Sequence, residues 1–217
     1  AETGIDNLEH GFFAMSDFTP NWKDDDQPNV IAAQKAAAAL DLDSPAVQGL
    51  IHLLIERKVA VTSTLAIMET FNPGCRIMTT AELDTLSAPA RENYLARWAK
   101  VNSRPRGEEA RAWTNYLELE KRFFRAGGLL VAGTDPTGYG GVIAGYGSWR
   151  TIELLVDTGL TPVEAIQVAT SNGAKLLGID RETGSIEAGK AADLVVAAGN
   201  PSAQITDLRK TELVFKD

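Results

Sequence analysis

Short apolar runs alternate with amphipathic segments along the chain. Residues 59–65 and 129–132 are mostly apolar or β-branched, which predicts two buried strands, and residues 5–9 form a third, shorter candidate. The stretches between them carry apolar residues at helical spacing. Strands that alternate with helices favour a parallel sheet covered by helices, so the pattern predicts an α/β fold.

Capping signals indicate where several helices begin and end. Residues 29–40 are rich in alanine and predict a helix, and the sequence from Ser44 supplies the N-cap and first-turn proline of the next one. Residues 161–164 form a capping box with a first-turn proline, and that helix is predicted to run to Leu177 and stop at Gly178. A further helix carries an apolar stripe made of Ala110, Trp113, Leu117 and Phe124.

A long insertion at residues 72–107 follows the second strand. Loops after such strands usually have roughly two to six residues, so this segment must carry structure of its own. It contains a capping box at Thr79 and Glu82. Its helical stripe consists of Tyr94, Leu95, Trp98 and Val101. A structured insertion at this place is expected to act as a substrate lid, and a stabilising or dimer-forming role is the alternative.

The chain changes character after Gly178. Residues 184–190 are rich in turn-forming residues, and residues 193–197 and 212–215 predict two strands separated by a turn at 199–201. A ribbon of about 40 residues cannot bury a core of its own. We therefore expect this tail to pack on another part of the protein.

The composition narrows the class of protein. A length of 217 residues suffices for one large domain or two small ones. The net charge of −8 argues against nucleic acid or an anionic membrane surface as a partner. No apolar run is long enough to span a bilayer, which favours a soluble protein of cytoplasmic or periplasmic location. The single cysteine, Cys75, excludes an intramolecular disulfide and a cysteine-based zinc site.

Two side chains that could take part in catalysis or bind a metal are predicted at strand ends. Asp135 follows the strand at 129–132 after a glycine and a threonine, and His10 follows the candidate strand at 5–9. The carboxyl ends of parallel strands are where α/β enzymes place their chemistry. Asp135 could instead cap a turn before the next proline, and a lone histidine is often structural. The second histidine, His52, lies in a predicted helix and is interpreted as a packing or surface residue.

A glycine-rich segment, residues 138–147, follows Asp135. Its spacing fails the dinucleotide-binding fingerprint and no Gly-Lys-Ser/Thr follows, so we expect no phosphate-binding loop. Aromatic side chains in and after this segment are candidates for lining a substrate pocket. These candidates are Tyr139, Tyr146 and Trp149. The acidic run at residues 24–26 lacks the glycine pivot of a calcium loop and is interpreted as a solvated loop.

Several motifs together carry a family resemblance. They are Thr-Pro-Val-Glu-Ala at 161–165, Ala-Thr-Ser-Asn-Gly-Ala at 169–174, Gly-Ser-Ile at 184–186 and Ala-Asp-Leu-Val at 192–195, with Gly-Thr-Asp at 133–135 and Ile-Asp-Asn-Leu-Glu-His-Gly at 5–11. The set resembles the amidohydrolase superfamily, and the nearest look-alikes are in its imidazolonepropionase and Xaa-Pro dipeptidase branch. The last two motifs resemble those that end barrel strands eight and six of that family.

The resemblance implies both a fold and a chemistry. Residues 1–180, including the insertion 72–107, would hold about strands six to eight of a TIM-like (β/α)8 barrel, and residues 181–217 the C-terminal strands of a small β-sandwich. The implied activity is metal-dependent hydrolysis of a C–N bond in a small amide, cyclic amide or dipeptide. The implied cofactor is one or two divalent metal ions, with zinc as the expected metal. Asp135 resembles the metal-binding carboxylate that acts as general base, and His10 resembles a ligand of the second metal.

The family's other metal ligands have no counterpart in this chain. Its paired histidines of strand one, its lysine or glutamate of strand four and its histidine of strand five are missing, and a catalytic zinc needs about three protein ligands. We therefore expect this chain to be the C-terminal portion of a longer enzyme, or a piece completed by a partner or by a second copy. The alternative is a non-catalytic amidohydrolase-like module that folds on a partner chain. No pattern identifies the substrate.

Overall fold

Three parallel strands form the central sheet of the structure, a computed structural model that describes residues 4–13, 18, 30–136 and 141–217. The strands are β1 (Asn7–Leu8), β2 (Ala60–Ser63) and β3 (Leu130–Ala132). β2 lies between the other two and pairs in parallel with each. The predicted α/β fold is therefore confirmed, although each strand is shorter than the sequence pattern indicated.

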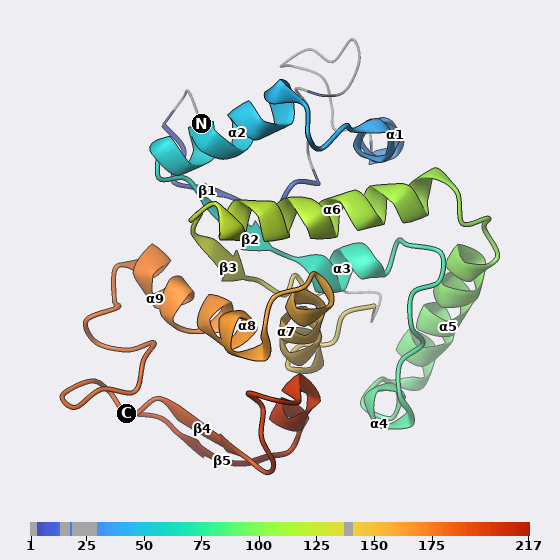
Figure 1. Cartoon of the computed structure of the whole chain (residues 1–217). Helices are drawn as coiled ribbons and strands as arrows, with labels where there is room; N and C mark the ends of the chain where they lie inside the picture. Colours follow the sequence, from blue (N-terminus) through green and yellow to red (C-terminus); the bar gives the residue numbers. More distant parts are fainter. Residues whose placement is uncertain (1–3, 14–17, 19–29, 137–140) are drawn as a thin grey trace.

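Helices connect the strands and cover the sheet (Figure 1). Between β1 and β2 lie α1 (Val30–Ala39) and α2 (Pro45–Glu56). Between β2 and β3 lie α3 (Leu65–Glu69), α4 (Thr80–Leu83), α5 (Ala88–Asn102) and α6 (Glu108–Arg125). After β3 come α7 (Tyr146–Asp157), α8 (Pro162–Ala169) and α9 (Ser171–Leu177). Figure 1 shows α1, α2 and α6 together on one side of the molecule and α7 to α9 on the other.

Side-chain caps confirm the predicted helix starts. The Ser44 hydroxyl accepts the backbone N–H of Val47 at 3.4 Å, just before the first-turn proline. Thr79 and Thr161 each form a complete capping box, in which the glutamate three residues later accepts the threonine backbone N–H. Gly178 ends α9 in the left-handed conformation, with φ 71°.

The single helix predicted from Thr161 to Leu177 is wrong, because two helices occupy this stretch. Thr170 departs from helical geometry at φ −126° and ψ −88°, between α8 and α9. Beyond the break, the buried Asn172 side chain donates a hydrogen bond to the Leu130 carbonyl of β3 at 2.9 Å. This contact joins residues 42 positions apart, so it cannot be predicted from local capping signals or helix periodicity.

The apolar stripe predicted for α6 is only the edge of its buried face. The predicted positions Ala110, Trp113, Leu117 and Phe124 are half-buried. The fully buried positions are Ala112, Tyr116, Leu119, Glu120 and Phe123. α6 contacts both α1 and β3, so a wider face is covered than one stripe. One of the buried residues is a glutamate, which a hydropathy pattern assigns to solvent.

The main core lies between the sheet and its helices. Its largest fully buried side chains include Ile51, Leu65, Leu119, Phe123, Leu130 and Leu154. The insertion has a small apolar cluster of its own, formed by Met78, Leu83 and Tyr94. Ile143, from the segment after β3, packs against that cluster. The insertion is thus folded onto the part of the chain that follows Asp135.

The C-terminal residues form a separate two-stranded antiparallel ribbon. It consists of β4 (Leu194–Ala197) and β5 (Thr211–Phe215), with the 3-10 helix η2 (Ile205–Arg209) between them. The connection predicted as a turn at 199–201 is therefore longer and includes η2, which contacts α7. Val195, Leu213 and Val214 are 60%, 55% and 69% exposed.

Among the described residues, no helix has the length and apolar character needed to cross a membrane.

The carboxyl group of Glu120 is buried under the turn that follows β1. Only 3% of the residue is exposed, and a Cβ added to Gly11 would lie 2.5 Å from its Oε1. Burial raises the pKa of Glu120 to about 8, although the Ser63 hydroxyl lowers it. The carboxyl is therefore protonated at neutral pH.

We expect Glu120→Gln to flatten the pH dependence of stability between pH 4.5 and about 8. In this range the unfolded chain has released the proton that the folded chain retains, so the free energy of unfolding falls by about 1 kcal/mol per pH unit as pH rises. Urea unfolding at several pH values measures this slope. A slope that is the same in the wild type and in Glu120→Gln would contradict the assignment.

Glu118→Gln is the matched control on the same helix. Burial acts to raise the pKa of Glu118, but hydrogen bonds from Arg122 and Lys121 outweigh it and lower that pKa. The stability that Glu118 contributes is therefore complete above pH 4.5 and is lost only in acid. The control should leave the slope between pH 4.5 and about 8 unchanged.

Candidate functional site

Residues that follow the three strands meet at one edge of the sheet. His10 follows β1, Thr64 follows β2 and Asp135 follows β3, and the strands are parallel neighbours. His10 Nδ1 lies 3.2 Å from Thr64 Oγ1 and 3.8 Å from Asp135 Oδ2. The side chains of His10 and Asp135 are 47% and 44% exposed. The structure thus brings together the two side chains that the sequence placed at strand ends.

Both residues adopt a backbone conformation that is rare outside glycine. φ is 64° at His10 and 50° at Asp135, and Lys58 is the third non-glycine residue with positive φ in the described part of the chain. This conformation costs about 1–3 kcal/mol and is concentrated at functional sites, although histidine and aspartate tolerate it better than most residues. Two such residues facing each other mark this edge as a candidate active site.

The start of α7 is held against the strand that leads to Asp135. The Thr151 hydroxyl donates to the Gly133 carbonyl at 2.9 Å. A Cβ on Gly133 would lie 2.7 Å from the Thr62 side chain, and one on Gly147 would lie 2.6 Å from that of Thr134. Glycine at these two positions lets β2, β3 and α7 approach each other closely. Asp135 is therefore carried by a closely packed part of the fold.

The donor types at this edge suit a divalent metal ion. An imidazole and a carboxylate are typical zinc ligands, and a catalytic zinc site needs about three protein ligands. Across residues 4–13, 18, 30–136 and 141–217, no group of three or more histidine, cysteine, aspartate or glutamate side chains is placed to hold a metal. The side chains of His10 and Asp135 are of types that bind such a metal. The described residues alone do not complete its coordination.

The aromatic candidates have different positions. Tyr146 starts α7 and lines a pocket, and the ring of Trp149 packs edge-on against it at 5.4 Å between centroids. Trp149 itself is not among the residues that line that pocket. Tyr139 and the acidic run at residues 24–26 lie outside the described residues. His52 is exposed on α2, in agreement with its interpretation as a surface residue.

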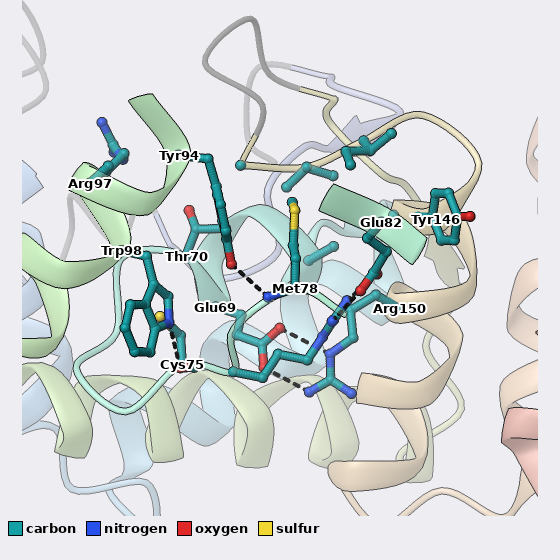
Figure 2. A pocket seen from close by; sticks show the side chains of 16 residues that line it. Glu69, Thr70, Cys75, Met78, Glu82, Tyr94, Arg97, Trp98, Tyr146 and Arg150 are labelled. Carbon is teal, nitrogen blue, oxygen red and sulfur yellow. Dashed lines mark hydrogen bonds and ion pairs between the residues drawn. The ribbon is translucent and has the colours of Figure 1, made fainter. Parts of the chain in front are cut away.

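The pocket that Tyr146 lines lies between the insertion, α3 and α7 (Figure 2). Its volume is about 40 Å³. Figure 2 shows Tyr94 and Trp98 of α5 on one side, Tyr146 on the other and Met78 between them. Glu69 and Arg150 also line it, together with Ala66, Val142 and Ile143. The insertion therefore supplies one wall of a pocket whose other walls come from the segments after β2 and β3.

A chain of ion pairs surrounds this pocket and was not predicted from the sequence. Arg150 of α7 donates to Glu69 of α3 at 2.7 and 2.9 Å, and to Glu153 at 3.2 Å. Arg209 of η2 donates to Glu153 at 2.5 and 3.0 Å and lies 3.6 Å from Glu82. The pairs link α3, α4, α7 and η2. Only the capping box at Glu82 gave a local signal for any member. The pairs of Arg150 with Glu69 and of Arg209 with Glu153 join residues 81 and 56 positions apart.

Glu82 is the most buried member of the chain of ion pairs, with 1% of its side chain exposed. Arg76 donates to both of its carboxylate oxygens, at 2.6 and 2.7 Å. Burial acts to raise the pKa of Glu82, but the hydrogen bonds from Arg76 and Thr79 outweigh it and hold that pKa at about 2. Glu82 is therefore ionised at neutral pH and anchors the insertion.

A sequence profile of the amidohydrolase family matches residues 46–216, which is most of the chain. The chain belongs to the amidohydrolase family. The expected family membership is thus confirmed.

Two deaminases are among the related amidohydrolases. Adenine deaminase 3 of Rhizobium meliloti is 37% identical over 69 residues, which are 32% of this chain and 12% of that protein. The 5′-deoxyadenosine deaminase of Methanobrevibacter smithii is 40% identical over 62 residues, 29% of this chain and 14% of that protein. The chain thus aligns with only a small part of each of these relatives.

Two solved structures share the fold over a longer stretch. A Xaa-Pro dipeptidase structure covers 99% of this chain with a TM-score of 0.58 and 23% identity, and the match is 39% of that chain. The ochratoxinase of A. niger covers 86% with a TM-score of 0.51 and 22% identity, 37% of that chain. The chain spans well under half the length of these structures.

We expect Glu82→Gln to lower the free energy of unfolding at neutral pH by about 3 kcal/mol, because it leaves Arg76 without its buried partner. Glutamine can still close the capping box with Thr79, so the change isolates the lost charge. Urea unfolding at pH 7 measures the effect. Because the pKa of Glu82 is about 2, the wild type should keep this contribution above pH 4.5 and lose it as pH falls toward 2.

Asp84→Asn is the control, since Asp84 forms an exposed pair with Arg91 on the same insertion. Exposed pairs contribute about 0–1 kcal/mol, so this variant should be close to the wild type in stability. Equal losses in both variants would contradict the anchoring role of Glu82.

Proposed function

We propose that this chain forms part of a metal-dependent hydrolase that cleaves a C–N bond of a small molecule. The observation that carries the proposal is the pair of His10 and Asp135, which face each other at the ends of neighbouring strands in a chain of the amidohydrolase family. The relatives named as deaminases and dipeptidase act on bonds of this kind. Their substrates suggest an amide, a cyclic amide, a dipeptide or an amino-substituted heterocycle.

Each residue at the edge has a distinct role in this proposal. His10, whose Nδ1 lies beside Thr64 and Asp135, would be a ligand of a divalent ion, most simply zinc. Thr64 fixes the orientation of the imidazole ring. Asp135 holds the proton that is taken from water and delivers it to the leaving nitrogen. A bound ion would supply the acidity that makes water a nucleophile near neutral pH.

We propose further that other chain segments complete the site. β1 and β3 each pair on one side only among the described residues, and three strands cannot close a barrel. In this interpretation β1, β2 and β3 are strands six to eight of the barrel, and residues 181–217 belong to a β-sandwich whose other strands cover the exposed ribbon. A longer polypeptide, a partner chain or a second copy could supply those segments, which would include the remaining metal ligands.

A non-catalytic module is the second candidate. It is favoured by the incomplete ligand set of the described residues and by the exposed apolar residues of the ribbon. In that case the chain would fold on a partner without forming a working metal site. The insertion would then be a stabilising element and not a substrate lid.

We expect Asp135→Asn to lower kcat by roughly 10²–10⁴-fold in the assembled enzyme, because the proton acceptor is lost. Asparagine tolerates the left-handed backbone, so the fold should persist. The assay measures hydrolysis of adenine, 5′-deoxyadenosine and Xaa-Pro dipeptides, with circular dichroism as the folding check. His10→Asn, designed on the same principle, should reduce both bound metal and activity.

Lys58→Asn is the matched control for both variants. Lys58 also has positive φ, at 56°, but it precedes β2 at the opposite end of the sheet. It should retain activity and metal content. Unchanged activity in Asp135→Asn, or equal loss in all three variants, would exclude the assigned roles and favour the non-catalytic module.

We expect tightly bound metal only in an assembly that contains segments besides this chain's monomer. Elemental analysis across a size-exclusion profile should find about one equivalent or more of a divalent metal in the larger species and far less in the monomer. His10→Asn should lose metal from the larger species. A stoichiometric, tightly bound ion in the monomer would overturn the proposal that other segments complete the site.

A further inference from the structure

Two of the segments that line the pocket walled by the insertion lead on from the edge where His10 and Asp135 meet. Ala66, which lines the pocket, is two residues beyond Thr64 in the chain. Gly147, on the opposite wall, is in close contact with Thr134, which precedes Asp135. The pocket is therefore continuous in structure with two of the three segments that build the candidate active site. A molecule held at that edge could direct a substituent into it.

Four of the charged groups of this pocket form two ion pairs. Glu69 is matched by Arg150, and Glu82 by Arg76. The guanidinium of Arg97 lies over the Phe71 ring, 5.2 Å from its centroid. A charged ligand group would have to break one of these two ion pairs, or displace Arg97 from the ring, in order to gain a partner among these side chains.

The polar atoms of the aromatic wall are also engaged. The Tyr94 hydroxyl accepts the backbone N–H of Met78 at 2.8 Å, and Trp98 Nε1 donates to the Cys75 carbonyl at 3.2 Å (Figure 2). Their ring surfaces, with the side chains of Met78, Val142 and Ile143, remain as the lining. These surfaces favour an apolar group by desolvation and dispersion.

The volume limits what can enter. A space of about 40 Å³ holds roughly three water-sized groups, since one water needs about 10–15 Å³ of such volume. A short aliphatic or thioether group fits this size, and an indole does not. Methionine is an adaptable neighbour, so Met78 suits contact with apolar groups of slightly different shapes.

We infer that this pocket binds a small uncharged apolar side chain of the substrate, and that the insertion thereby determines which side chains are accepted. The inference rests on the hydrolytic function proposed above and adds the chemical class of the substrate's side chain. It makes Ile143, Met78 and Trp98 specificity-determining residues, none of which takes part in the bond cleavage.

The test measures binding without turnover. Calorimetry on the Asp135→Asn protein, in the same assembled form as the enzyme, would use the N-acetyl amino acid amides of glycine, valine, leucine, methionine, lysine, glutamate and tryptophan. We expect the leucine and methionine probes to bind at least tenfold more tightly than the glycine probe, because several carbon atoms become buried. The lysine, glutamate and tryptophan probes should bind no better than the glycine probe.

Two opposite variants separate this role from general damage to the fold. Ala66→Val enlarges a lining side chain, which makes the pocket smaller, and should shift the preference from leucine toward valine. Ile143→Ala shortens a lining side chain, which makes the pocket larger, and should shift the preference from leucine toward the longer methionine side chain. Ile152→Ala is the matched control, since Ile152 is a half-buried isoleucine of α7 that packs on the main core and does not line the pocket. It should leave the order of the probes unchanged.

The outcomes distinguish this inference from the proposed reaction. Equal binding of all probes, or an order that neither Ala66→Val nor Ile143→Ala changes, would overturn the pocket's role even in a protein that hydrolyses C–N bonds. The expected reciprocal shifts support it, and they are read from binding alone. If they occur while Asp135→Asn retains full hydrolysis, the assignment of Asp135 fails and the pocket stands.

Discussion

The pairing of β2 with both of its neighbours is the constraint on which the rest of the structure depends. All four residues of β2 are buried. The carbonyls at its end also hold the segments that carry His10 and Asp135, because the Thr62 carbonyl accepts the backbone N–H of Gly11 at 2.8 Å and the Ser63 carbonyl accepts that of Gly133 at 2.7 Å. His10 and Asp135 are therefore positioned by the same short strand. A shift in the register of either pairing would separate the two side chains.

The chain of ion pairs has a different role from the core. Buried ion pairs contribute little net stability compared with apolar packing, since desolvation cancels much of their attraction, but breaking one is costly. Arg150 bridges three carboxylates and Arg209 bridges two, and these carboxylates come from α3, α4 and α7. This arrangement fixes how the insertion and η2 lie against α7. It thus defines the shape of the pocket more than it raises the stability of the fold.

The parts of the fold that local physics determines were predictable from the sequence. The three strands, the caps at Ser44, Thr79 and Thr161 and the left-handed end at Gly178 depend on neighbouring residues. The placement of His10 and Asp135 at strand ends was also predicted, and their meeting at one edge is what the parallel pairing of the strands adds. Their assignment as catalytic and metal-binding residues remains a prediction.

Contacts between distant residues could not be predicted in this way. The break at Thr170 accompanies a hydrogen bond from Asn172 to β3, and the buried position of Glu120 depends on the turn that packs above it. The pairing of Arg150 with Glu69 spans 81 positions and leaves no local signal in helix periodicity. For the same reason, the sequence indicated the insertion and the aromatic candidate Tyr146 but not the pocket that they help to form. The prediction that the insertion acts as a substrate lid depends on whether that pocket binds substrate.

The exposure of His10 and Asp135 bears on whether this edge of the sheet could support catalysis. At nearly half exposure, charges on these groups are screened by water, and preorganised electrostatic catalysis needs a site from which water is largely excluded. Among the described residues, β1 and β3 each pair on one side only. In the proposed assembly, further strands at these two sides would cover the edge and exclude water from it. Under that proposal, metal binding and the catalytic role of Asp135 would depend on the same added segments.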